Sequence, residues 1–254
     1  MNSTNFLNEE TTWPLLKFFG ITHPFFDIFP SIILNTWIIM GGMGCLILLA
    51  NKVLLKKDSY LRFCIYEIIS SLIDMVTQSL GSFSYKHFSF IAALFFFIVS
   101  CNLAGVIPYL KEPTVNLNTT IALGLVGLLY RDFFAIKKYG IMGYIKEFFQ
   151  PLFVMFPLHI MGKFSSLISI SFRLFGNILG GEKISHIWFD FAANNTILNI
   201  LNFSGIGLVI QLFFGIFEGV IQAFVFAMLS LTYLSLALAH EEDDHKETIE
   251  KVIE

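Results

Sequence analysis

The stretch Ser169-Ile-Ser-Phe-Arg-Leu-Phe-Gly-Asn-Ile-Leu-Gly-Gly-Glu182 places Arg173 inside an apolar run that extends from about Pro151 to Leu179. Neither Asp nor Glu occurs within eight positions of Arg173 on either side. A guanidinium group keeps its proton, and a charge at the centre of a bilayer costs at least about 2.5–3.5 kcal/mol on insertion scales. We therefore expect Arg173 to face a protein interior or a water-filled path and to meet an anion from outside its own segment.

The composition around this stretch predicts an all-α integral membrane protein. Of 254 residues, 56% are hydrophobic and 14% are charged, and several apolar runs exceed the roughly 20 residues that cross a bilayer as a helix. The net charge of −3 gives no indication of nucleic-acid binding. The three cysteines have neither paired nor metal-ligand spacing, so we expect no cofactor and no metal site.

The order of apolar and polar runs predicts a single membrane domain, with five transmembrane helices, one interfacial helix and the N-terminus outside. Basic clusters that include Lys52 and Lys137 mark the inner side. The expected segments are a polar N-terminal segment (1–29), a span (31–55), an amphipathic interfacial helix (58–85), spans at 88–109 and 118–136, long helices at 144–184 and 197–239, and a charged tail (240–254). Each long helix has about 40 residues, or roughly 60 Å where 30 Å would span, which predicts strong tilt.

The long segment around Arg173 carries polar residues on two different faces. Ser169, Arg173 and Asn177 are four residues apart and share one face of a helix. Glu182 and His186 share another face, close to opposite Arg173. This layout would suit an arginine that separates two aqueous pockets. A polar turn is expected after it, at about 185–196.

The last long segment repeats this pattern with a buried acid. Glu218 and Gln222 lie on one face, and Tyr233 returns to that face eleven residues after Gln222. A carboxyl group in an apolar run indicates either a relay group or a static counter-ion of Arg173. Asn116 and Asn118 either cap the helix that follows them or line a polar path.

Three motifs resemble subunit a of the F-type ATP synthase. They are Ser169-Ile-Ser-Phe-Arg-Leu-Phe-Gly-Asn177 followed by Gly181-Glu182, Ile221-Gln-Ala-Phe-Val-Phe226, and Pro113-Thr-Val-Asn-Leu-Asn-Thr-Thr-Ile-Ala-Leu123. The resemblance covers nearly the whole chain in order. It implies a stator protein beside a rotating ring of c subunits, each with a membrane-buried carboxylate.

The resemblance also implies roles for individual residues and partners. Arg173 corresponds to the essential charge between two offset half-channels, and Gln222 faces it from the last helix. The expected ion path comprises Ser169, Asn177, Glu182, His186, Glu218, Gln222, Tyr233, Asn116 and Asn118. The expected partners are the c ring, the peripheral-stalk b subunits, other ATP synthase subunits and the lipid bilayer. The chain binds no nucleotide and is no enzyme on its own, and its ion is H⁺ or Na⁺. The expected location is a bacterial inner membrane, with an organellar inner membrane as the alternative.

The sequence departs from the family pattern at several polar positions. Gly215 stands where an acid or histidine is usual, so Glu218, one turn nearer Gln222, is a hypothetical replacement. Asn116 stands where Asp is frequent, and Ser166-Leu167 replaces the usual Lys-Pro. Two alternatives stay open: a secondary transporter with a buried arginine site, and a non-catalytic membrane scaffold. The sequence shows no internal duplication of the kind that favours a transporter.

Overall fold

The computed structural model describes residues 13–14, 27–28, 30–55, 60–107, 112–149, 155–195, 199 and 205–239. The predicted charged tail (240–254) and most of the predicted N-terminal segment lie outside the described residues. Two two-residue strands, β1 (Trp13–Pro14) and β2 (Asp27–Ile28), pair antiparallel. The other described elements are helices, because an apolar chain satisfies its backbone groups in a membrane by forming helices.

The helices follow the apolar runs of the sequence in order. They are α1 (Pro30–Leu54), α2 (Tyr60–Leu80), α3 (Tyr85–Ala104), the 3₁₀ helix η3 (Pro113–Val115), α4 (Leu117–Phe149), α5 (Met155–Ala193), α7 (Gly207–Gln211), the π-helical turn η5 (Leu212–Phe217) and α8 (Glu218–Ala239). Since α7, η5 and α8 are consecutive, residues 207–239 form one long helical segment. The predicted all-α class is therefore confirmed.

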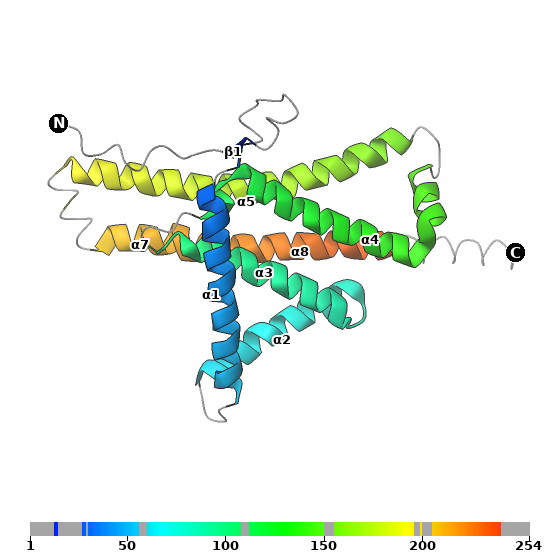
Figure 1. Cartoon of the computed structure of the whole chain (residues 1–254), viewed down its shortest axis with the longest axis horizontal. Helices are drawn as coiled ribbons and strands as arrows, with labels where there is room; N and C mark the ends of the chain where they lie inside the picture. The colour runs from blue at the N-terminus through cyan, green and yellow to red at the C-terminus, as the bar shows by residue number, and fades with distance from the viewer. Residues whose placement is uncertain are drawn as a thin grey trace, which may run out of the picture.

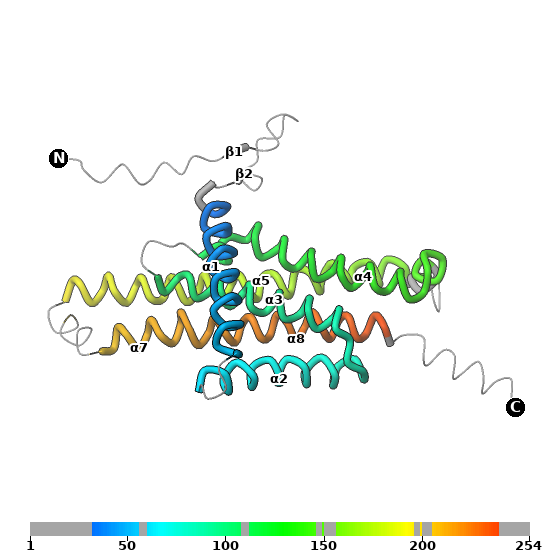
Figure 2. Tube along the Cα trace, turned by 60° about the horizontal axis from the view of Figure 1, so that its bottom comes forward, coloured from blue at the N-terminus to red at the C-terminus, as the bar shows by residue number. Residues whose placement is uncertain are grey.

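The two long helical segments lie side by side and run antiparallel (Figures 1 and 2). α1 crosses both at a steep angle, and α4 begins beside the middle of α5 and diverges from the first half of α5 (Figure 1). If α1 crosses the membrane, then α5 and α8 are strongly inclined to the membrane normal, as their length requires. The figures also show α2 leaving the end of α1 in a direction different from that of α1.

Five helices are long and apolar enough to cross a membrane among the residues that the structure describes. They are 32–54, 60–80, 85–104, 117–145 and 207–238. This set includes α2, which was predicted to be interfacial and has the lowest hydropathy of the five. It does not include α5, whose apolar turns are interrupted by polar residues such as Arg173 and Asn177. The interfacial position of α2 stays a prediction.

Two predicted boundaries are wrong. Residues 144–149 belong to α4, which continues past residue 136 and changes direction at Gly140 (φ 75°), a conformation that favours glycine. α5 begins at Met155 and continues through the predicted polar turn to Ala193. The polar residues there do not end the helix, because Glu182 and His186 stand one turn apart on the side of a continuing helix.

The core lies where α3, α5 and α8 meet. Ile170, Leu174 and Ile178 of α5 pack with residues of the two other helices, namely Leu94, Ile98, Ala223 and Phe226. A second cluster joins α2 to α3 and α8 through Leu72, Met75, Val76, Ile91, Ala227 and Leu231. Outside this core, many large apolar side chains of α5 and α8 are exposed in the part of the chain that the structure describes.

Candidate functional site

The arginine predicted from the sequence lies on the open side of α5. Ser169, Arg173 and Gly176 are exposed, whereas Ile170 and Leu174 beside them are buried in the core. Arg173 makes no hydrogen bond and no ion pair with any residue that the structure describes. The prediction that Glu218 is a static counter-ion of Arg173 is therefore not supported in the described part of the chain. The guanidinium group is positioned to meet a partner from outside.

A polar cavity lies towards the C-terminal end of α5, and we call it the Glu112 cavity. Its volume is about 230 Å³, which is room for several water molecules. The polar and glycine residues of its wall include Asn102, Glu112, Glu182, His186, Gly215 and Gly219. The predicted pair Glu182 and His186 is in contact, with Oε1 and Nε2 3.7 Å apart. Glu218 does not line this cavity, but its Oε2 lies 3.3 Å from the position of a Cβ atom on Gly181, which is part of the wall.

Glu112 is a member of this cavity that the sequence reasoning missed. Its carboxyl group occupies the space that a Cβ atom on Gly105 would need, at the end of α3. Burial raises the pKa of Glu112 from 4.5 to about 7, and the negative charge of Glu182 adds to this effect. The Lys111-Glu112-Pro113 loop was the only signal in the sequence, and it reads as an ordinary polar turn.

Asn102 is the second missed residue, and it connects three elements at the same cavity. Its Nδ2 donates to the carbonyl oxygen of Gly219 at 2.8 Å, and its Oδ1 accepts from Thr114 Oγ1 at 2.9 Å. Asn102 is 2% exposed, so these bonds satisfy an amide that would otherwise be costly to bury. In the sequence, the signal for Asn102 was an amide side chain within the apolar span predicted at 88–109.

Three adjoining cavities lie at the other end, and we call them the Arg131 cavities. Their volumes are about 20, 310 and 310 Å³, and all three are bordered by Arg131 of α4 and Tyr233 of α8. Ser166 borders two of them, as does Lys163. Tyr233 was predicted from the sequence to face a polar path, whereas the positions of Arg131 and Lys163 were not foreseen.

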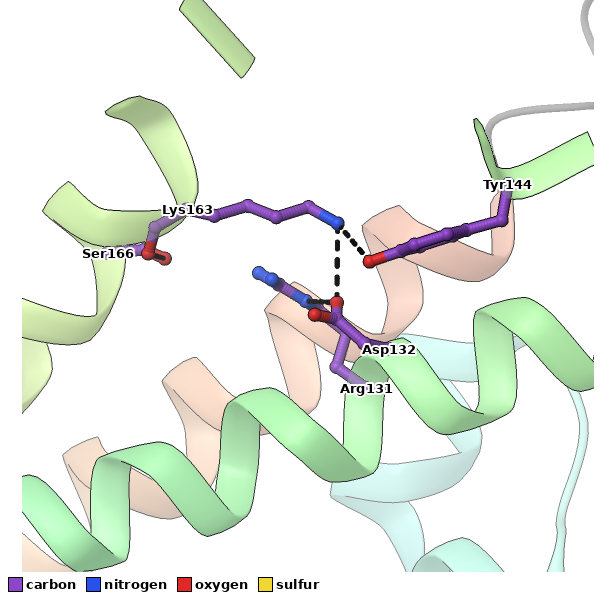
Figure 3. Close-up of polar contacts among 5 residues, drawn as sticks. All are labelled: Arg131, Asp132, Tyr144, Lys163 and Ser166. Carbon is purple, nitrogen blue, oxygen red and sulfur yellow. Dashed lines mark hydrogen bonds and ion pairs between the residues drawn. The ribbon is translucent and has the colours of Figure 1, made fainter. Parts of the chain in front are cut away.

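The charged groups of the Arg131 cavities form a connected set (Figure 3). Arg131 Nε donates to Asp132 Oδ1 at 3.0 Å, and Lys163 Nζ donates to the same oxygen at 3.4 Å and to Tyr144 Oη at 2.6 Å. Arg131 is 8% exposed, and its Nη2 is buried with no hydrogen-bond partner among the described residues. The free end of the guanidinium group points away from Asp132, towards the side where Ser166 and Lys163 lie (Figure 3).

The apolar core separates the two groups of cavities. Along α5, Ser166 borders the Arg131 cavities and Glu182 the Glu112 cavity, while Arg173 lies between them, about 10 Å from Ser166 and about 14 Å from Glu182 at 1.5 Å per residue. On α8, Gly219 and Tyr233 border opposite cavities. Leu174, Ala223 and Phe226 are packed between these ends and are at most 2% exposed.

The remaining predicted residues have less direct positions. Gln222 is 8% exposed, on the turn of α8 after Gly219, and Asn177 is half-buried. Asn116 Oδ1 accepts from the backbone N–H of Asn118 at 2.9 Å, so Asn116 caps the start of α4, one of the two roles considered for it. Asn116 and Asn118 do not border the Glu112 cavity or the Arg131 cavities as the structure describes them.

Comparison with known proteins identifies the family. A family model described as ATP synthase A chain matches residues 33–235. ATP synthase subunit a of Moorella thermoacetica is 33% identical over 205 residues, covering 81% of this chain and 89% of the relative. The same subunit of a Geobacter species is 32% identical over 232 residues, covering 89% and 96%. That of Desulforamulus reducens is 37% identical over 156 residues, covering 61% and 58%. The chain therefore belongs to the ATP synthase subunit a family, the membrane subunits of the F0 sector of ATP synthase.

Proposed function

We propose that this chain carries ions between two half-channels beside the c ring of a rotary ATP synthase and so couples an ion-motive force to ATP synthesis. The observation that carries the proposal is that the Glu112 cavity and the Arg131 cavities, each bordered by charged side chains, lie towards opposite ends of α5 and α8, separated by packed apolar side chains, with exposed Arg173 between them. An ion cannot pass directly through the packed core. It has to leave one cavity on a carrier that moves past Arg173.

A ring carboxylate would supply that carrier. The positive Arg173 attracts an ionised carboxylate and repels a bound cation, so the carrier releases its ion before it passes. The exposed face around Arg173 leaves room for such a neighbour, because Ser169 and Gly176 have small side chains and are exposed. A membrane potential of 100 mV supplies about 2.3 kcal/mol of free energy for each charge that crosses the membrane.

The distribution of basic residues orients the two cavities. Exposed Lys137 and Lys138 lie on α4 beyond Arg131, and Lys138 Nζ donates to the Leu238 carbonyl oxygen at 2.5 Å near the end of α8. Basic residues favour the inner side of the membrane. The Arg131 cavities then belong to the inner half-channel and the Glu112 cavity to the outer one. We further propose a bacterial inner membrane, and the c ring, the b subunits and other ATP synthase subunits as partners.

The decisive test is Arg173→Ala in the intact complex, measured as ATP-driven ion pumping into vesicles. Pumping should be abolished, because the carboxylate loses the charge that forces ion release. Lys183→Ala is the matched control, since Lys183 is an exposed cation ten residues further along α5. Pumping that persists in the Arg173 variant would contradict the proposed mechanism.

A further inference from the structure

The cavities on the two sides of Arg173 differ in the sign of their charge. Among described residues, the wall of the Glu112 cavity has the carboxyl groups of Glu112 and Glu182 and neither Lys nor Arg. In the part of the chain that the structure describes, the walls of the Arg131 cavities have the two cations Arg131 and Lys163 and one carboxylate, that of Asp132.

From this difference we infer that Glu112 and Arg131 are positioning residues, whose charges bias the carrier towards loading from the outer side and unloading to the inner side. This inference rests on the proposed function. A negative surrounding favours the ion-loaded form of a ring carboxyl group, and a positive surrounding favours its ionised, unloaded form. The charges act at a distance through a medium of low polarity, so contact with the carrier is not needed.

The structure holds both charges in place. The Glu112 carboxyl group fills the space above Gly105, where a larger residue would displace it. Arg131 is more than nine-tenths buried, and Nη2 keeps an unused donor on the side that faces Ser166. A guanidinium group cannot escape its charge by losing a proton, so the inner cavities stay positive at any working pH.

Other titratable groups lie close to Glu112, and a different set lies close to Arg131. Glu182 and His186 of α5 line the Glu112 cavity, and Cys101 of α3 interacts electrostatically with Glu112. Glu218 of α8 lies beside Gly181 of the cavity wall. Asp132 and Tyr144 of α4, His159 and Lys163 of α5 and Tyr233 of α8 are near Arg131. For this reason the test compares variants that remove one charge with variants that keep it at the same position.

The experiment uses the whole complex in sealed vesicles, with the coupling ion varied independently on each side during ATP synthesis. The variants are Glu112→Gln with Glu112→Asp as control, and Arg131→Gln with Arg131→Lys as control. At pH 8, which is above the pKa of about 7 and leaves the Glu112 carboxyl group ionised, Glu112→Gln should raise the outer ion concentration needed for half-maximal synthesis roughly tenfold, as expected for one charge removed at roughly 10–15 Å with an effective dielectric constant of about 20. Arg131→Gln should lower the inner ion concentration that halves the synthesis rate, and by the same reasoning this decrease should be roughly tenfold. Both charge-keeping variants should resemble the wild type.

Three results would overturn the inference: no shift in either removal variant, a shift of the same size in the charge-keeping variant, or a shift on the wrong side of the membrane. If Arg131→Gln fails to assemble, Asp132→Asn serves instead and should raise the inner inhibitory concentration. The Arg173→Ala result is independent of these measurements. An inactive Arg173 variant with unshifted Glu112 and Arg131 variants would leave the proposed function standing and remove this inference alone.

Discussion

Glu112 shows how a single residue acquires its properties from tertiary contacts. Its pKa of about 7 means that the folded protein keeps a proton which the unfolded chain has released above pH 4.5. Folding stability must therefore fall as the pH rises from 4.5 to 7, by about 1–3 kcal/mol. We expect the protonated-carboxyl band of Glu112 in infrared difference spectra to titrate near neutral pH. Glu112→Gln should remove the band and raise the thermal midpoint of the complex more at pH 8 than at pH 5. Glu67→Gln, on the exposed side of α2, is the control and should do neither.

The contact between α3 and α8 is decided at the scale of elements. A Cβ atom on Gly219 would lie 2.9 Å from Asn102 Cβ, so the two helices approach closely only because residue 219 is glycine. Gly219→Val should push them apart, break the Asn102 hydrogen bond and cost about 1–3 kcal/mol, the usual range for overpacking. Gly44→Val on α1 is the matched control, since no atom lies within 4 Å of its added Cβ. Thermal unfolding of the purified complex measures both. Equal stability of the two variants would show that this contact does not hold the helices.

At the scale of the whole molecule, the helices that the structure describes leave large apolar side chains of α5 and α8 exposed. Phe172 of α5 is 49% and Phe224 of α8 is 46% exposed, and Ser169, three residues before Phe172, is exposed as well. If this exposed surface meets the c ring, Ser169→Cys should form a disulfide with a cysteine placed near the ring carboxylate. Ser171→Cys is the control, because Ser171 is fully buried against α4, with its Oγ 2.4 Å from the Cβ position of Gly124. Gel electrophoresis of oxidised membranes measures the cross-link. A cross-link at both positions, or at neither, would argue against this docking face.

The sequence by itself determined the membrane class, the two long helical segments, the family and the shared face of Ser169 and Arg173. Helical periodicity fixes these features because they depend on residues within a few turns of each other. Helical periodicity also placed Glu182 and His186 on a helix face different from that of Arg173. The expected turn at 185–196 failed, because polar residues on one side of a helix resemble a loop when the cavity they line is not known.

Only the tertiary structure brought together residues that are distant in sequence. Asn102 bonds to Gly219, 117 residues away, and Lys163 reaches Asp132 across 31 residues. Helix periodicity states which residues share a face, but it does not state which helices become neighbours. The Glu112 cavity, the Arg131 cavities and their opposite charges depend on that choice of neighbours. The packing of α3, α4, α5 and α8 therefore decided which polar side chains share a space, and with it the electrostatic difference between the two ends of the molecule.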